Sequence, residues 1–234
     1  MRHNRAMQVG VLFLAAGSGR RFGGDIPKQY QCIHGISLVE LGLRHLAAEP
    51  RIAWLQPVLA EGDTRFAACL AAQGLPYTVL PAVSGGAERA ISMSRGLAAL
   101  PAECEWVAVQ DAARPIPSPQ LLKDVLDAAL MHGAAVPGMD VHDTIKQVDE
   151  QGRVVATLNR STLRAVQTPQ VARRASFEAA MDRFSGELER FTDDASLLEA
   201  AGFPVFVSPG EATNRKITTL QDMAWLRRHW EEVA

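Results

Sequence analysis

Short apolar runs alternate along this chain with segments in which apolar residues recur at helical spacing. The run Val-Gly-Val-Leu-Phe-Leu at 9–14 predicts a buried strand, and the leucines that follow Ser37, a suitable N-cap, predict a helix. Further strands are expected at 55–59, 77–80 and 106–109, and further helices at 66–72, 88–100 and 119–132. This alternation predicts an α/β fold in which helices flank both faces of a mostly parallel, twisted sheet.

The pattern changes after Pro137. Residues 143–148 and 153–157 each alternate polar and apolar side chains, and Glu150-Gln151-Gly152 between them predicts a turn. A hairpin outside a parallel sheet often grips another subunit, so we expect residues 138–165 to form a dimerisation arm. Helices are expected again at 173–184 and 193–201, then a short strand at 205–207 and a terminal helix. Because no long linker interrupts residues 1–234, we expect a single domain.

Composition narrows the classes of function. The chain has 234 residues, of which 47% are apolar, and a formal net charge of only -2. A general affinity for nucleic acid or for an anionic membrane is therefore not expected, and basic residues gathered locally must hold any bound polyanion. The three cysteines are scattered, which argues against a disulfide framework and a zinc site. No stretch approaches the roughly 20 apolar residues of a membrane span, so we expect a cytoplasmic protein.

A glycine-rich loop directly follows the first predicted strand. Its sequence, Ala15-Ala16-Gly17-Ser18-Gly19-Arg20-Arg21, allows a ligand to approach the backbone and lets exposed N–H groups bind phosphate. The spacing is not GxGxxG, which argues against a dinucleotide site. Two arginines in the loop and Lys28 shortly after it supply fixed positive side chains. We therefore expect this loop to bind a triphosphate, to neutralise its charge and to support its cleavage.

The sequence LAAGSGRRF, followed by PKQY, resembles the signature of the 2-C-methyl-D-erythritol 4-phosphate cytidylyltransferase family. Other segments resemble the family in the same order: GGAERAIS at 85–92, DAARP at 111–115, DTIK at 143–146, QTPQ at 167–170, TDDAS at 192–196 and NRKIT at 214–218. The resemblance covers residues 9–222. It implies a homodimer with a Rossmann-like nucleotidyltransferase fold that transfers CMP from CTP to methylerythritol phosphate and releases pyrophosphate, in non-mevalonate isoprenoid precursor biosynthesis.

The implied reaction is attack by a phosphate monoester oxygen on the α-phosphorus of CTP. Such a monoester is largely dianionic at neutral pH, so its oxygen is already ionised and no general base is needed. Catalysis then depends on positioning and on charge stabilisation. The resemblance places Arg21 and Lys28 at the triphosphate, and Arg160 and Lys216 around the phosphate of the second substrate. Arg20 is expected to be a surface residue.

Asp111 follows the apolar strand at 106–109. A carboxylate at the carboxyl end of a parallel strand lies where α/β proteins bind ligands, so we assign Asp111 to a magnesium ion beside the nucleotide. A helix N-cap or a salt bridge with Arg114 is the alternative interpretation. Arg114 is expected to contact the polyol phosphate or Asp111 itself.

The resemblance also assigns contacts with the substrates. For the nucleotide these are Ala15, Ala16, Gly17, Gly19, Gly86, Arg89 and Ser92, with Ser92 bonded to the base edge and Gly86 leaving room for it. For the polyol phosphate they are Arg114, Asp143, Thr144 and Thr168. Thr144 lies at the start of the arm, where it could contribute to the active site of the neighbouring subunit. The chain departs from the family pattern at Gln110, Ala87 and Ile91, where many relatives carry histidine, an acidic residue and a polar residue.

Three other functions fit part of the sequence. A ribitol 5-phosphate cytidylyltransferase would share the loop and the metal and differ in the polyol pocket. A nucleotide-sugar glycosyltransferase would normally carry a DxD motif, which Asp111-Ala112-Ala113 lacks. A non-catalytic dimeric nucleotide-binding module would bind CTP without turnover.

Overall fold

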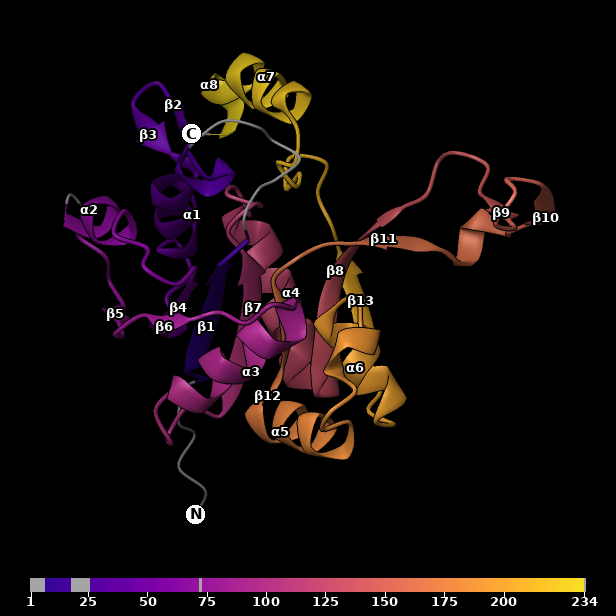
Figure 1. The fold of residues 1–234 in the computed structure, drawn as a ribbon, viewed down its shortest axis with the longest axis horizontal. Coiled ribbons are helices and arrows are strands. Elements are labelled where there is room, and N and C mark those ends of the chain that lie inside the picture. The colour runs from indigo at the N-terminus through magenta and orange to yellow at the C-terminus, as the bar shows by residue number, and fades with distance from the viewer. Residues whose placement is uncertain (1–6, 18–25, 72, 234) are drawn as a thin grey trace.

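The computed structural model of the protein describes residues 7–17, 26–71 and 73–233. Within that part of the chain, nine strands form one central sheet in the order β11-β8-β12-β7-β1-β4-β5, with β13 paired to β8 and β6 paired to β4 (Figure 1). The strands are β1 (Val9–Ala15), β4 (Ile52–Leu59), β5 (Thr78–Val79), β6 (Val83–Ser84), β7 (Trp106–Asp111), β8 (Ala134–Asp140), β11 (Arg164–Val166), β12 (Gln170–Arg173) and β13 (Phe206–Pro209).

Most of these strands run parallel, which confirms the predicted fold class. β1 pairs in parallel with β4 on one side and with β7 on the other. The exceptions are β12, which runs antiparallel between β7 and β8, and β11, which runs antiparallel to β8. Neither of these strands was predicted, and β6 and β8 were not predicted either.

The predicted helices are present, and where both bounds were predicted the ends differ by one residue at most, but the predicted terminal helix is divided into two helices. They are α1 (Leu38–Leu46), α2 (Phe66–Ala71), α3 (Arg89–Ala99), α4 (Pro119–His132), α5 (Arg174–Arg183), α6 (Asp194–Ala200), α7 (Leu220–Arg228) and α8 (Trp230–Val233). The expected cap at Ser37 is confirmed: its hydroxyl accepts from the Glu40 N–H at 3.2 Å, and its own N–H donates to the Glu40 carboxylate at 2.8 Å. This reciprocal pair satisfies two N–H groups that the helix leaves open.

The helices cover the sheet in two layers, because successive side chains of a strand point to opposite faces. In β1, Val11 and Phe13 belong to the apolar cluster that also contains residues of α1 and α4. Leu12 between them belongs to the cluster on the other face, with residues of α3 and α5. All three side chains are fully buried. The sheet is therefore the middle layer of three, which fixes its carboxyl edge as a rigid platform.

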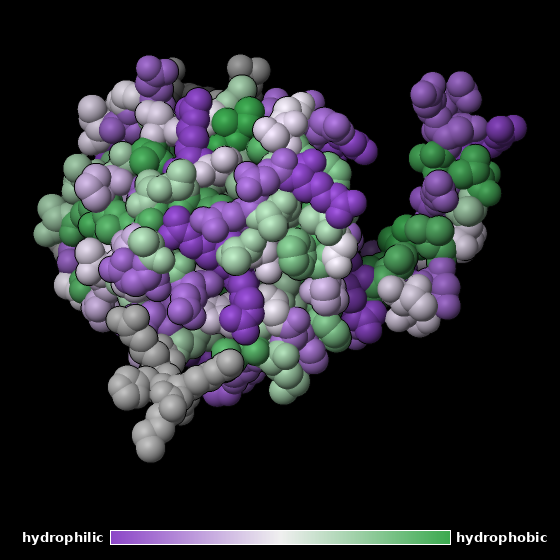
Figure 2. Space-filling view, turned by 90° about the horizontal axis from the view of Figure 1, so that it is seen from below, coloured by the Kyte–Doolittle hydropathy of each residue, from purple (hydrophilic) through white to green (hydrophobic). Residues whose placement is uncertain are grey.

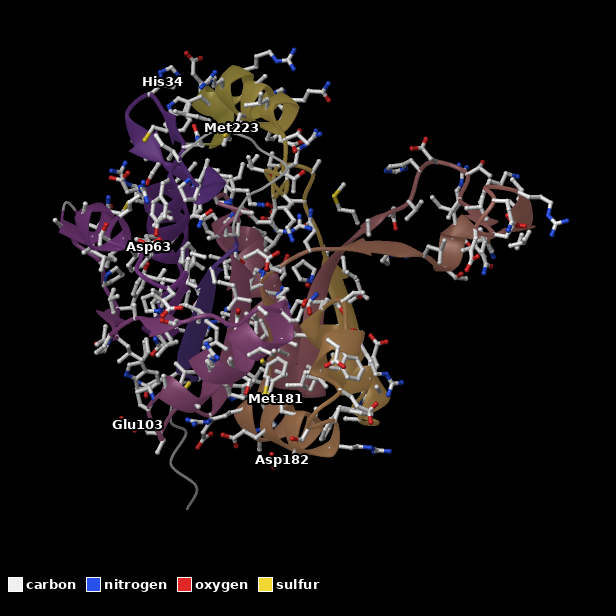
Figure 3. All side chains as sticks on the ribbon, in the orientation of Figure 1. His34, Asp63, Glu103, Met181, Asp182 and Met223 are labelled. Atoms are coloured by element: carbon white, nitrogen blue, oxygen red, sulfur yellow. The ribbon has the colours of Figure 1, made fainter. Side chains whose placement is uncertain are left out.

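A third, smaller apolar cluster joins the C-terminal helices to the hairpin of β2 (Cys32–Ile33) and β3 (Ile36–Ser37). It contains Ile33, Leu38, Leu41, Ile116, Ile217, Met223 and Leu226. Figure 3 shows His34 in the hairpin and Met223 on α7 at the same end of the molecule, and the His34 and Trp230 rings lie 5.3 Å apart. This cluster connects the segment just after Lys28 with the segment that carries Lys216.

The predicted hairpin is present and projects from the body of the molecule (Figure 1). β9 (Lys146–Val148) and β10 (Val154–Thr157) form a separate antiparallel pair, and β8 with β11 forms the root of the projection. The arm carries exposed apolar side chains, visible as green areas in Figure 2, among them Val148, Val154 and Val155, each 51–54% exposed. None of the helices in the described ranges is long and apolar enough to cross a membrane.

Candidate active site

A cavity of about 460 Å³ opens at the carboxyl ends of β1 and β7. The chain leaves β1 toward β4 on one side and returns to β7 on the other, and such a switch point is where open α/β sheets bind ligands. The lining residues come from five segments that are distant in sequence: Leu14, Ala15, Ala16 and Gly17; Lys28 and Gln29; Gly86, Ala87, Glu88, Arg89 and Ser92; Asp111, Ala112 and Ala113; and Lys216.

The end of β1 forms one wall of this cavity. Ala15, Ala16 and Gly17 line it as predicted, whereas Gly19 and Arg21 lie outside the described residues. The sequence analysis did not assign a role to Gln29, which is buried beside this wall. Its side-chain amide donates to the Ala15 carbonyl at 2.7 Å and to the Gly17 carbonyl at 3.3 Å. Gln29 therefore ties the start of the glycine loop to the segment that carries Lys28.

A second wall is formed by the chain before α3. The Ser92 hydroxyl accepts from the Gly86 N–H at 3.0 Å and donates to the Glu88 carbonyl at 3.2 Å. A Cβ atom on Gly85 would lie 2.4 Å from the Ala16 Cβ, so glycine is needed where the two walls meet. That Gly86 leaves room for the base stays a prediction, and the structure gives a second reason for glycine at this position. A Cβ there would lie 2.2 Å from the Ile91 Cγ2, so Gly86 accommodates Ile91.

Asp111 lies at the base of the cavity with a cation on each carboxylate oxygen. Lys216 Nζ is 2.6 Å from Oδ2, and Arg89 Nη2 is 3.2 Å from Oδ1. Burial alone would raise the pKa of Asp111, but Arg89 and Lys216 reverse this effect and hold the pKa below its ordinary value. The carboxylate is therefore ionised at neutral pH. The alternative interpretation named Arg114 as the salt-bridge partner of Asp111 and was wrong in that partner, because Arg89 and Lys216 form the ion pairs.

Arg89 was predicted to contact the nucleotide, and the structure gives it a further role. Its Nη1 donates to Asp194 Oδ1 at 2.7 Å, so the guanidinium lies between two carboxylates. Burial disfavours its charge, but Asp194 and Asp111 outweigh that effect and raise its pKa above the ordinary value. Asp194 is 2% exposed and is the first residue of α6. The sequence analysis recognised the segment 192–196 but assigned no role to Asp194, because only the fold brings it to Arg89.

The residues present fit a magnesium ion. Among the residues that the structure describes, no cluster of three or more His, Cys, Asp and Glu side chains could hold a metal. Magnesium usually takes one or two protein carboxylates and completes its shell with substrate phosphates and water. Asp111, ionised and facing a cavity lined by Lys28 and Lys216, provides such a carboxylate.

Thr168 and Arg114 support the base of the cavity. The Thr168 hydroxyl accepts from the Asp111 N–H at 3.2 Å. Arg114 does not line the cavity: its guanidinium donates to the Asn214 carbonyl at 2.8 Å and thereby binds the loop that carries Lys216. Gln110, at the position where many relatives carry histidine, donates from its amide to the Arg114 carbonyl at 2.7 Å. These contacts hold the turn after β7.

Lys216 is held by its neighbours in sequence. The Ile217 N–H donates to the Ala113 carbonyl at 2.7 Å, and the Ile217 side chain is fully buried. The next two residues, Thr218 and Thr219, each donate to the Asp222 carboxylate at 2.9 Å, from both backbone and hydroxyl. The lysine therefore extends from a segment anchored on both the sheet and α7.

Among the predicted residues that the structure describes, Arg114 and Thr168 support the cavity without lining it, and three more lie away from it. Asp143, Thr144 and Arg160 are exposed on the arm, and Arg160 donates to the His142 carbonyl. Within one chain these residues do not line the cavity, because β8 and β11 carry the arm away from the carboxyl ends of β1 and β7. Their contact with substrate stays a prediction that requires a second chain.

The chain is similar to known proteins of one family. The model of the family IspD, 2-C-methyl-D-erythritol 4-phosphate cytidylyltransferase, matches residues 9–228. The 2-C-methyl-D-erythritol 4-phosphate cytidylyltransferase of Symbiobacterium thermophilum is 42% identical over 231 residues, which cover 97% of this chain and 94% of the relative. The bifunctional enzyme IspD/IspF of Nitrobacter winogradskyi is 40% identical over 217 residues, or 92% of this chain. The chain spans about half the length of that relative, 54%.

Solved structures agree as well. The 2-C-methyl-D-erythritol 4-phosphate cytidylyltransferase of Thermus thermophilus has a TM-score of 0.76 at 33% identity, with 95% of this chain and 98% of that chain covered. The 4-diphosphocytidyl-2C-methyl-D-erythritol synthase of Anaerococcus prevotii has a TM-score of 0.83 at 26% identity, with 96% and 98% covered. Sequence, fold and cavity thus agree, and the chain belongs to the 2-C-methyl-D-erythritol 4-phosphate cytidylyltransferase family.

Proposed function

We propose that the protein transfers CMP from CTP to 2-C-methyl-D-erythritol 4-phosphate and releases pyrophosphate. The observation that carries the proposal is the cavity at the ends of β1 and β7, where Lys216 and Arg89 pair with Asp111 and Lys28 lines the same cavity. Two polyanions must meet there despite their repulsion, and fixed positive charge in a partly buried site offsets that repulsion. The name of the family and of its relative describes the transfer of a cytidylyl group to 2-C-methyl-D-erythritol 4-phosphate.

In this proposal the nucleotide lies across both walls of the cavity. The cytosine is held near Gly86 and Ser92, and the backbone of Ala15, Ala16 and Gly17 binds the phosphates together with Lys28 and Arg21. Magnesium held by Asp111 would neutralise phosphate charge. Lys216 then faces the second substrate, because it is 42% exposed in its side chain and lies beside Asp111. The phosphate monoester needs no general base, so these residues orient the substrates and stabilise charge.

We also propose that the active form is a homodimer joined by the arms. The apolar side chains of β9 and β10 are exposed in one chain, and exposed apolar surface of this kind favours association. A second cavity of about 550 Å³ lies at the root of the arm, between β8, Arg164 and β13. Docking of one arm against a second chain would bring Arg160, Asp143 and Thr144 to the substrate. Because the reaction consumes CTP, we place it in the cytoplasm.

Two experiments test these proposals. Pyrophosphate release is measured with CTP, magnesium and either methylerythritol phosphate or ribitol 5-phosphate. Release with the first substrate is expected; release with ribitol phosphate alone would assign the chain to the related polyol enzyme, and CTP binding without release would indicate a binding module. For the dimer, sedimentation of a variant lacking residues 146–157 should show half the mass of the intact protein. An unchanged mass would exclude the arm as the contact.

A further inference from the structure

One arginine at the base of the cavity is shared between two aspartates. Arg89 Nη1 lies 2.7 Å from Asp194 Oδ1, while its Nε and Nη2 both lie 3.2 Å from Asp111 Oδ1. Asp194 does not line the cavity and is 2% exposed. Its second oxygen, Oδ2, is buried and has no hydrogen-bond partner among the described residues. Burial of a carboxylate costs free energy unless its charge and its oxygens are paired, so the presence of Asp194 at this place requires an explanation.

The fold holds Asp194 in place through β12. The Gln170 side chain accepts from the Ala195 N–H at 2.8 Å and donates to Asp193 Oδ2 at 2.8 Å. Gln170 therefore fixes the first turn of α6 to β12. In the pairing of β12 with β7, Gln170 lies opposite Val109, which is two residues before Asp111. This contact gives a role to Gln170 and to the segment 192–196, to which the sequence analysis assigned none.

The charges of the cluster explain why a second carboxylate is present. Burial raises the pKa of Asp194 above its ordinary value, and the nearby Arg89 opposes this effect. With both carboxylates ionised, Asp111 and Asp194 balance the two positive charges of Arg89 and Lys216, which they contact. Without Asp194 the same cluster would carry one excess positive charge beside Asp111. Arg89 would then have one counter-ion instead of two and would bind Asp111 more tightly. Both effects would disfavour a further cation at the Asp111 carboxylate, because like charges repel strongly where water is excluded.

We propose that Asp194 is a positioning residue that balances Arg89 and so keeps the Asp111 carboxylate available to the divalent cation that accompanies CTP. The inference rests on the proposed function, since it takes Asp111 as the ligand of that cation. Asp194 acts through Arg89 and does not itself touch the substrate. Residues that hold a metal ligand in this way typically change metal affinity about 10–100-fold when they are substituted.

The test is Asp194→Asn, with Asp193→Asn as the matched control. Both changes remove one carboxylate from the same helix start, and asparagine caps a helix about as well as aspartate, but only Asp194 contacts Arg89. CTP binding is measured by calorimetry in magnesium and in EDTA. For Asp194→Asn we expect the gain in CTP affinity that magnesium provides to fall about 10–100-fold, while the affinity in EDTA is unchanged or higher. For Asp193→Asn, the gain in CTP affinity that magnesium provides should stay within about twofold of the gain in the original protein.

The outcomes separate this inference from the proposed function. Equal magnesium gains in the two variants would overturn the role of Asp194 and leave the proposed reaction intact. No magnesium gain in the original protein would overturn the metal role of Asp111, and this inference with it. If Asp194→Asn does not fold, as thermal melting would show, the double variant Asp194→Asn, Arg89→Gln removes the unpaired charge. The double variant should then fold and regain most of the increase in CTP affinity that magnesium provides. A folded double variant without that increase would contradict the inference that Asp194 balances the charge of Arg89.

Discussion

Replacement of Gly85 by alanine tests whether the junction of the two cavity walls binds the nucleotide. The added Cβ would lie 2.4 Å from the Ala16 Cβ and 2.8 Å from the Ser92 hydroxyl, so both walls must move apart. Overpacking of this kind costs about 1–3 kcal/mol, which for a chain of this length lowers the melting temperature by about 2–4 °C per kcal/mol. The displaced Ser92 hydroxyl should also lose its bond to the Gly86 N–H, worth about 0.5–1.5 kcal/mol.

The loss of that hydrogen bond gives a magnitude for binding. An energy of about 0.5–1.5 kcal/mol corresponds to a roughly 2–13-fold weaker affinity for CTP if the nucleotide needs Ser92 in its present place. The assay is calorimetric titration with CTP, accompanied by thermal melting. Gly10→Ala is the matched control, because a Cβ there would lie 2.6 Å from Cys104 Sγ, among apolar residues that do not line the cavity.

The comparison separates packing from binding. Both alanine variants should melt at lower temperature than the original protein, but only Gly85→Ala should bind CTP more weakly. Gly74→Ala serves as a neutral reference, because nothing lies within 4 Å of a Cβ at that position. If Gly85→Ala melts lower and still binds CTP with unchanged affinity, the nucleotide does not use the junction of the two walls, and the reasoning is refuted.

Three further predictions concern the cations and their supports. Lys28→Ala should lower the rate of pyrophosphate release by about two to three powers of ten, since it removes a charge at the triphosphate; near-normal turnover would contradict the assigned role. Burial alone would raise the pKa of Asp222, but hydrogen bonds from Thr218 and Thr219 hold it well below its ordinary value. The ionised Asp222 therefore stabilises the fold fully above its unfolded-state pKa of about 4, and this stabilisation is lost as pH falls toward the folded-state pKa. The difference in stability between the original protein and Asp222→Asn should narrow in thermal melts below about pH 4. A difference that widens on acidification would exclude this reasoning. Ile217→Ala should cost about 2–5 kcal/mol in denaturant unfolding because the side chain is fully buried, whereas the exposed Leu220→Ala should cost little; equal losses would show that the third apolar cluster does not support the Lys216 segment.

Much of the architecture was determined by the sequence alone. The apolar run at 9–14 and the helical spacing after Ser37 and Pro119 predicted β1, α1 and α4, because burial patterns and caps are local properties. The alternation at 143–157 predicted the hairpin of the arm for the same reason. The residues 15–17, Lys28, Gly86, Ser92 and Asp111 were predicted at one site, and all of them line the cavity.

Only the tertiary structure decided how the charges pair. Sequence reasoning placed Arg89 at the nucleotide and gave Asp194 no role, but the two residues are 105 positions apart in the chain and meet because β12 inserts antiparallel beside β7. It also placed Arg160 beside Lys216, whereas the arm carries Arg160 away from the cavity of its own chain. Ion pairs between distant residues depend on strand order, which leaves no periodic signal in the amino-acid sequence.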